Sequence, residues 1–156
     1  MVHTLRLVST AYLVTIAGCE QPSEDTALPV TETDRDFGNY VVHFNALTTD
    51  QLTAEIAQRH GIVRSNNRAM LNVSILRKVE GSIGVPVAAA VSVSASNLTG
   101  QLKNVNVREV REEEAIYYLA ECAVANGETL IFEIDATPET EDNPLSIRYR
   151  KQFFLN

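Results

Sequence analysis

Short segments of alternating apolar and polar residues fill the chain from Phe37 onward, and they restrict its fold more than any other feature. A period of two residues is typical of a strand with one buried face and one solvated face. We therefore expect a mainly β domain, an antiparallel β-sandwich of immunoglobulin-like kind, with an open barrel as the alternative. The expected strands are Phe37–Ala46, Met70–Lys78, Val87–Asn97, Leu102–Arg111, Ala115–Ala125, Glu128–Thr137 and Leu145–Leu155.

One segment between the first two expected strands departs from this alternation. Thr48 and Gln51 have the spacing of a capping box, and apolar residues follow from Leu52 at helical spacing. Gly61 then offers the left-handed conformation that ends many helices. We expect one short helix of about two to three turns, inserted after the first strand.

The pair Asn126-Gly127 lies between the fifth and sixth expected strands. Asn-Gly is the strongest two-residue signal for a hairpin, in which a type I′ turn requires positive φ at both positions. We therefore expect Ala115–Ala125 and Glu128–Thr137 to pair with each other.

The beginning of the chain has the order of an export signal. Arg6 gives a positive start, an apolar run extends from Leu7 to Ala17, and small residues lead to Cys19. This run of about eleven residues is too short for a hydrocarbon core, which needs roughly twenty. Ile16-Ala17-Gly18-Cys19 resembles the lipobox of bacterial lipoproteins, with ordinary cleavage or no cleavage as the alternatives. The resemblance implies a diacylglycerol on the sulfur of Cys19, cleavage before it and acylation of the new amino group.

Several acyl chains hold a protein on a membrane far better than one does, so this modification predicts stable attachment. In enteric bacteria an aspartate after the lipidated cysteine resembles a signal for retention in the inner membrane. This chain has Glu20 there, which favours the outer membrane. We expect residues 1–18 to be a signal peptide and the mature protein to lie on the periplasmic side of the envelope.

Residues 19–36 are expected to be the lipidated cysteine and an acidic, disordered tether. From Glu20 to Asp36 there are six acids and one base, two prolines and no aromatic residue, so this stretch cannot bury a core. The 120 residues 37–156 suit one compact domain. Of the 13 basic and 20 acidic residues in the chain, this domain keeps 11 and 14. This slightly negative domain lacks the excess of basic residues that nucleic-acid binding requires, so we expect no nucleic acid as a partner.

The sequence contains no arrangement typical of an active site. Cys122 shares a strand face with Tyr118 and Ala120, where a buried thiol acts as a small apolar residue. If Cys19 carries lipid, Cys122 has no partner for a disulfide. No Gly-rich phosphate loop or nucleophile elbow occurs, and no residue at ligand spacing completes a metal site with His43. We expect no catalytic residue, metal or cofactor, and a protein that is not an enzyme.

Polar residues in loops and on strand faces supply the candidate binding residues, since binding residues concentrate on loops held by a rigid scaffold. Asn97 and Gln101 flank a glycine turn, where their amides either face a ligand or satisfy the turn backbone. Arg64 follows the expected helix and either binds an anion or forms a structural salt bridge to Glu109 or Glu112. The full set of candidates is Tyr40, His43, Arg64, Asn97 and Gln101.

Similarity to a known family lies in separate segments of the expected domain. They are Phe37–Phe44, Gly61–Ser65, Asn97–Gln101, Arg108–Arg111, Ala115–Tyr118 and Gln152–Phe154. Together they resemble an uncharacterised family of small exported proteins of Gram-negative bacteria, known as a domain of unknown function. The resemblance implies a single exported β-domain and adds no activity or catalytic residue. Members of that family carry an ordinary signal, so the lipobox here departs from the pattern.

The function expected from the sequence is that of a non-enzymatic envelope lipoprotein. It would be an interaction or accessory domain with an envelope protein as its partner, reaching the membrane through lipid on Cys19. The alternative is a periplasmic domain that binds a small ligand or glycan in a polar cleft near the candidate residues. A pocket that joins Tyr40, His43 and Arg64 would favour this alternative, and a flat polar surface would favour the interaction domain.

Overall fold

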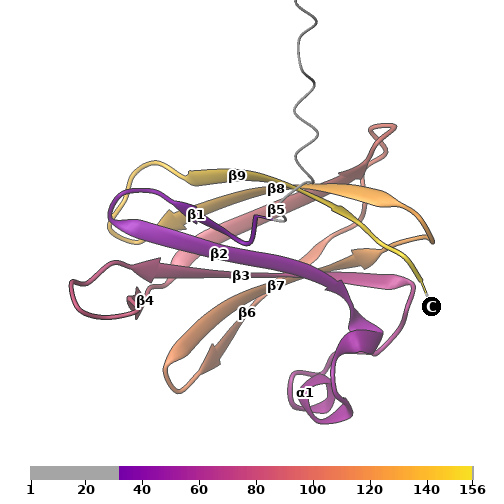
Figure 1. Cartoon of the computed structure of the whole chain (residues 1–156), viewed down its shortest axis with the longest axis horizontal. Helices are drawn as coiled ribbons and strands as arrows, with labels where there is room; N and C mark the ends of the chain where they lie inside the picture. Colours follow the sequence, from indigo (N-terminus) through magenta and orange to yellow (C-terminus); the bar gives the residue numbers. More distant parts are fainter. Residues whose placement is uncertain (1–31, 156) are drawn as a thin grey trace, which may run out of the picture. The chain divides into compact units, whose positions relative to one another are not determined.

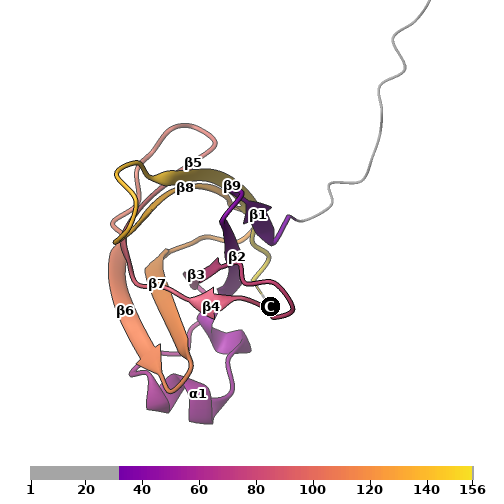
Figure 2. The ribbon, with the colours of Figure 1, turned by 90° about the vertical axis from the view of Figure 1, so that its left-hand side faces the viewer.

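The computed structural model describes residues 32–155 of the 156-residue chain. Two antiparallel sheets pack face to face, and one short helix packs on the outside of the larger sheet (Figures 1 and 2). This arrangement confirms the mainly β sandwich with a single short α-helix after the first long strand. Residues 32–155 include no helix that is both long and apolar enough to span a bilayer.

The larger sheet has the strand order β1-β2-β3-β7-β6, and the smaller sheet has the order β5-β8-β9. The strands of the larger sheet are β1 (Asp34–Asp36), β2 (Tyr40–Thr48), β3 (Arg68–Arg77), β7 (Ala115–Ala123) and β6 (Asn106–Glu112), with β4 (Val85–Pro86) paired to β3 off this path. Those of the smaller sheet are β5 (Ala89–Asn97), β8 (Thr129–Pro138) and β9 (Leu145–Gln152). Every strand expected from the alternation is present.

Strand β1 lies in residues that we expected to belong to the tether. Asp34 is opposite His43, and Arg35 is opposite Val42, so the domain begins before Phe37. The sequence Asp-Arg-Asp has no apolar residue and therefore no strand pattern. Its conformation comes from hydrogen bonds to the edge of β2, a tertiary interaction that composition does not report.

Alternate residues of the strands build the core between the two sheets. In β2 the side chains of Tyr40, Val42 and Phe44 are buried, whereas those between them face outward. Phe44 meets Tyr149 edge-on at 5.1 Å between ring centroids. Cys122 is buried in the same core, and this burial raises the pKa of its thiol to about 11. The thiol therefore stays protonated and uncharged at neutral pH. This agrees with the expectation that Cys122 acts as a small apolar residue.

The helical segment after β2 is divided into two pieces. A 3₁₀ turn, η1 (Thr49–Gln51), comes first, and α1 (Ala54–Arg59) begins after an extended residue at Leu52. The capping box expected at Thr48 is wrong, because the Gln51 side chain donates to the Thr48 hydroxyl and Thr48 caps no backbone N–H. The helix is capped by Thr53, whose hydroxyl accepts from the N–H of Ile56 at 3.2 Å.

Asn126-Gly127 carries the chain from one sheet to the other. The hairpin expected here is wrong, because β7 belongs to the larger sheet and β8 to the smaller one. Gly127 has φ +72°, while positive φ is confined to glycines among the described residues, so Asn126 does not adopt it. The N–H of Glu128 donates to the Ala125 carbonyl at 3.1 Å. This geometry fits a type II turn, which does not match the twist of a two-stranded hairpin.

We expect Gly127→Val to lower the free energy of unfolding by about 1–2 kcal/mol, because a β-branched residue is strained at φ +72°. A Cβ at this position would meet no atom within 4 Å, so crowding adds nothing to that cost. Gly127→Asn is the matched control and should lose less, since asparagine tolerates this conformation. Urea unfolding compares the variants, and a Gly127→Val protein as stable as the wild type would refute this turn geometry.

Candidate binding groove

The two outward faces of the sandwich differ in character. On the smaller sheet, β8 and β9 present charged residues outward, such as Glu133 opposite Arg148, while β5 presents the exposed Ser92 and Ser94. The outward face of the larger sheet carries ion pairs of Glu121 with Arg68 and Arg108. Beside them it presents amides, hydroxyls and apolar side chains, namely Asn45, Leu47, Met70, Asn72, Ser74, Tyr117 and Leu119. Helix α1 covers one end of this face and the β3–β4 loop borders the other. We call the concave surface between them the outer groove.

The first part of the outer groove is the helix pocket, a cavity of about 330 Å³ between α1 and the larger sheet. Its floor belongs to a second apolar cluster, apart from the main core, that includes Ala57, Met70 and Leu119. Ile56 of α1 lines the pocket and is 40% exposed. Asn72 also lines it, and its buried Oδ1 has no hydrogen-bond partner among the described residues. The pocket therefore has a largely apolar floor.

A contact between a histidine and a carboxylate borders the helix pocket. The Nε2 atom of His60, just after α1, lies 3.1 Å from Oε1 of Glu112 at the end of β6. Because His60 and Glu112 come from elements far apart in the sequence, the pair ties the helix to the β6–β7 turn. The contact positions the helix over the sheet.

The second part of the outer groove is the strand fork, a cavity lined by β4 and the first residues of β7. Strand β7 pairs with β3 only from Tyr118 onward, and β4 takes its place beside Leu76 of β3. The resulting cavity measures about 830 Å³. It shares Tyr117 and Glu112 with the helix pocket, so the two parts form one surface.

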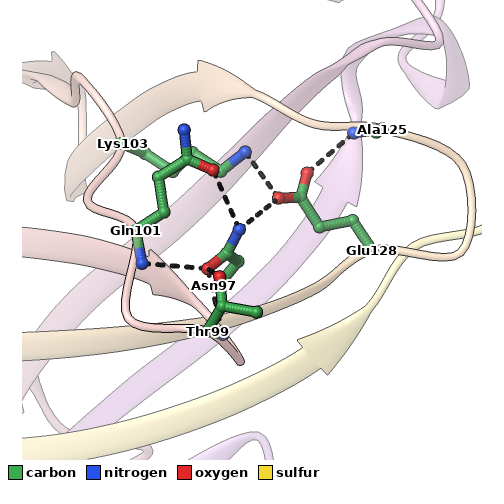
Figure 3. Close-up of polar contacts among 6 residues, drawn as sticks. All are labelled: Asn97, Thr99, Gln101, Lys103, Ala125 and Glu128. Carbon is green, nitrogen blue, oxygen red and sulfur yellow. Dashed lines mark hydrogen bonds and ion pairs between the residues drawn. The ribbon is translucent and has the colours of Figure 1, made fainter.

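Asn97 and Gln101 bond to each other within the β5–β6 loop (Figure 3). Oδ1 of Asn97 accepts from the N–H groups of Thr99 at 3.1 Å and Gln101 at 2.9 Å. Its Nδ2 donates to Oε1 of Gln101 at 3.1 Å. Both amides therefore serve the turn, which is one of the two arrangements that the sequence left open.

An ion pair that no sequence pattern indicated lies beside this loop. Nζ of Lys103 is 2.6 Å from Oε1 of Glu128, and the two side chains are only 17% and 14% exposed (Figure 3). The other carboxylate oxygen accepts from the N–H of Ala125 at 2.8 Å. Burial acts to raise the pKa of Glu128, but the hydrogen bonds from Lys103 and Ala125 outweigh it and hold that pKa below its ordinary value. The pair joins the β5–β6 loop to the β7–β8 turn.

Arg64 lies in the connection between α1 and β3. The hydroxyl of Thr49 donates to the Val63 carbonyl at 2.8 Å and accepts from the N–H of Ser65 at 2.9 Å, which holds this connection in place. The Arg64 guanidinium is exposed and donates to the Asp50 carbonyl at 2.7 Å. This partner is a backbone oxygen and not one of the glutamates that the sequence suggested.

The structure does not bring the five candidates together. Tyr40 and His43 lie on opposite faces of β2, so they cannot line one pocket with Arg64. The Tyr40 hydroxyl is 2.7 Å from Oγ1 of Thr140 and fastens β2 to the β8–β9 loop. His43 is exposed and borders a hollow of about 320 Å³ that shares Asn72 with the helix pocket. Of the five, His43 is therefore nearest to the outer groove.

The residues of the outer groove escaped the sequence interpretation because they come from five strands, a helix and the connections between them. One signal did exist in β2 and β3. The alternation that turns Leu71 and Val73 inward also turns Leu47 and Met70 outward, onto the face that should be polar. Apolar residues on a solvated face indicate that something covers them or binds there.

Comparison with known proteins gives the family. The model described as a domain of unknown function, DUF4426, matches residues 34–156. This chain belongs to the DUF4426 family. A crystal structure of a DUF4426 protein from Pseudomonas aeruginosa PAO1 is 33% identical, with 81% of this chain and 97% of that chain covered and a TM-score of 0.68. The resemblance found in the sequence is confirmed.

Two more distant structures share the fold of this DUF4426 domain. FetP of uropathogenic Escherichia coli strain F11, expressed in the periplasm, is 12% identical, with 79% of this chain and 93% of that chain covered and a TM-score of 0.56. A copper-bound variant of FetP is 10% identical, with coverage of 81% and 92% and a TM-score of 0.54. No curated protein matches this chain. Within residues 32–155, no group of three or more His, Cys, Asp or Glu residues is placed to hold a metal ion.

Proposed function

We propose that this DUF4426 protein is a non-enzymatic interaction domain of the cell envelope that recognises an envelope protein through the outer groove. The observation that carries the proposal is the contrast between the two outward faces. The larger sheet borders a groove with exposed apolar side chains, including Ile56 and Ile83, whereas the outward face of the smaller sheet presents charged residues and serines. Apolar side chains gathered in a groove with a polar rim are typical of interaction sites.

The location in the envelope is also part of this proposal. The export-type beginning of the chain and the lipobox at Cys19 support it, and they lie outside the described residues. The expression of FetP in the periplasm agrees with an exported domain of this fold. In the proposal, lipid on Cys19 holds the domain on the periplasmic side of a membrane, with the outer membrane as the expected one.

A periplasmic domain that binds a small ligand is the second candidate function. The helix pocket, at about 330 Å³, has a volume within the range of small-molecule sites, roughly 300–1,000 Å³. Leu47 and Met70 line this pocket and would contact the apolar part of such a ligand. The geometry therefore suits a small molecule with an apolar body.

Photo-crosslinking tests the choice between these functions. We expect a photoreactive residue at Ile56 or Ile83 to capture one envelope protein in intact cells, because both side chains are exposed in the outer groove. The same residue at Ser94, on the outward face of the smaller sheet, is the control and should capture none. Capture of the same proteins from both faces would contradict the interaction groove. Failure at both groove positions, with a small molecule retained by the purified protein, would favour the second function.

A further inference from the structure

The strand fork contains a free strand edge. Strand β7 pairs with β6 from Ala115 onward but with β3 only from Tyr118 onward. In the part of the chain that the structure describes, no strand pairs with Ala115–Tyr117 on the side away from β6. Unpaired N–H and C=O groups along such an edge are a template for another extended segment.

The opposite side of the fork is closed. The N–H of Val87, just after β4, donates to the Ile75 carbonyl of β3 at 3.0 Å, so β3 already has a neighbour there. The chain then crosses to the smaller sheet, where the N–H of Ala89 donates to the Tyr118 hydroxyl at 2.8 Å. These contacts hold the β4 side in place. An added strand can therefore pair with β7 and not with β3.

The side chains that line the fork suit an apolar segment. Ile83 is 95% exposed and Val85 is 42% exposed, and both face the cavity with the partly buried Leu76 and Ile116. Apolar side chains this exposed and this close together favour burial against a partner.

The wall formed by the β6–β7 turn is acidic. Glu113 and Glu114 line the fork and are exposed, and neither forms an ion pair within the described residues. Their neighbours have partners of their own, since Arg111 pairs with Glu109 and Glu112 contacts His60. Glu113 and Glu114 thus give this wall a negative charge that a basic partner would complement.

We propose that the strand fork binds an extended segment of a partner protein in which basic and apolar residues alternate. The segment adds as a strand to the Ala115–Tyr117 edge of β7, with apolar side chains on Ile83 and Val85 and basic side chains beside Glu113 and Glu114. In such a segment successive side chains point to opposite faces, so the basic ones share one face of the added strand and the apolar ones share the other. This inference rests on the proposed function and specifies the class of partner that the outer groove accepts.

A capped peptide, Lys-Val-Lys-Val-Lys-Val, is the probe for this proposal, with Glu-Val-Glu-Val-Glu-Val as its acidic counterpart. We expect saturable binding of the basic peptide alone, measured by fluorescence anisotropy, that weakens as salt is added. Hydrogen exchange of the amides in Ala115–Tyr117 should slow in the complex. A basic peptide with N-methyl groups on alternate residues should not bind, because it cannot complete the strand ladder.

Reversing the charges of Glu113 and Glu114 tests whether the acidic wall binds the basic peptide. The double variant Glu113→Lys with Glu114→Lys should weaken binding of the basic peptide about tenfold or more. Glu133→Lys with Asp135→Lys makes the same change in net charge on the outward face of the smaller sheet and should leave binding unchanged. Equal losses in both double variants would mean that the peptide responds to net charge alone and would overturn the proposal.

Three other results would also overturn it: no saturable binding of the basic peptide, equal binding of the acidic peptide, or slowed exchange elsewhere than Ala115–Tyr117. If crosslinking at Ile83 still captures an envelope protein, the proposed function stands and only the class of partner is wrong. If the basic peptide binds at the fork but no groove position captures a protein, the strand-addition site stands and the proposed function is wrong.

Discussion

Glu128→Gln is expected to lower the free energy of unfolding by about 2–3 kcal/mol at neutral pH, because it leaves the ammonium of Lys103 nearly buried without its counter-ion. Removing one partner of a fully buried pair costs roughly 3–5 kcal/mol, and the slight exposure of this pair reduces that figure. The interaction joins two loops at one end of the sandwich, so its loss loosens both. Lys103→Met combined with Glu128→Leu should recover part of the loss, because no unpaired charge then remains.

The same carboxylate makes stability depend on pH. Because the pKa of Glu128 is lower in the folded state than its ordinary value, the unfolded chain binds the proton more readily. Its contribution is therefore complete above the ordinary glutamate pKa of about 4.3 and is lost as the pH falls through the lower folded-state pKa. The difference in stability between the wild type and Glu128→Gln should shrink below about pH 4.

Urea unfolding between about pH 7 and pH 3 measures this difference. Glu133→Gln is the matched control, since Glu133 is an exposed glutamate on β8, and should change stability by no more than about 0.5 kcal/mol. A gap between the wild type and Glu128→Gln that stayed constant over this pH range would show that the loss comes from packing and not from charge.

Cys19→Ser is expected to convert a membrane-bound protein into an unprocessed or soluble one. The lipid in the lipobox reading is joined to the cysteine sulfur as a thioether, and a serine hydroxyl cannot take its place. Labelled palmitate should therefore enter the wild type and not the variant, and fractionation should move the variant out of the washed membranes. Since several acyl chains anchor a protein stably where one does not, we expect most of the protein to leave the washed membranes in the variant.

The chain contains two cysteines, and the other one supplies the control. Cys122 is buried in the core, so Cys122→Ala should keep the palmitate label even where it alters stability. Label that persists in Cys19→Ser would refute lipidation at Cys19. If Cys122→Ala folded normally but lost the label, the lipid would be on Cys122 and not on Cys19.

The strands could be predicted from the sequence because each has one buried face. In a strand with one buried face, apolar residues recur with a period of two. In β8, Phe132 and Ile134 face the core while Glu133 faces water, and no other backbone conformation satisfies that order. The buried, unreactive Cys122 follows from the same alternation. The family could also be identified from the sequence, through segments that span the whole domain.

The alternation of apolar residues does not determine which strands pair. Strands pair through backbone hydrogen bonds, and these do not depend on the order of the side chains. Asn126-Gly127 indicated a hairpin, yet β8 pairs with β5 and β9 in the other sheet. For the same reason the scattered candidates Tyr40 and Arg64 did not mark a site. Only the tertiary structure places β4 where β7 leaves β3, and this placement opens the strand fork between Ile83 and the acidic β6–β7 turn. Local residue order determined the elements of this protein, whereas the packing of distant segments decided where its groove lies.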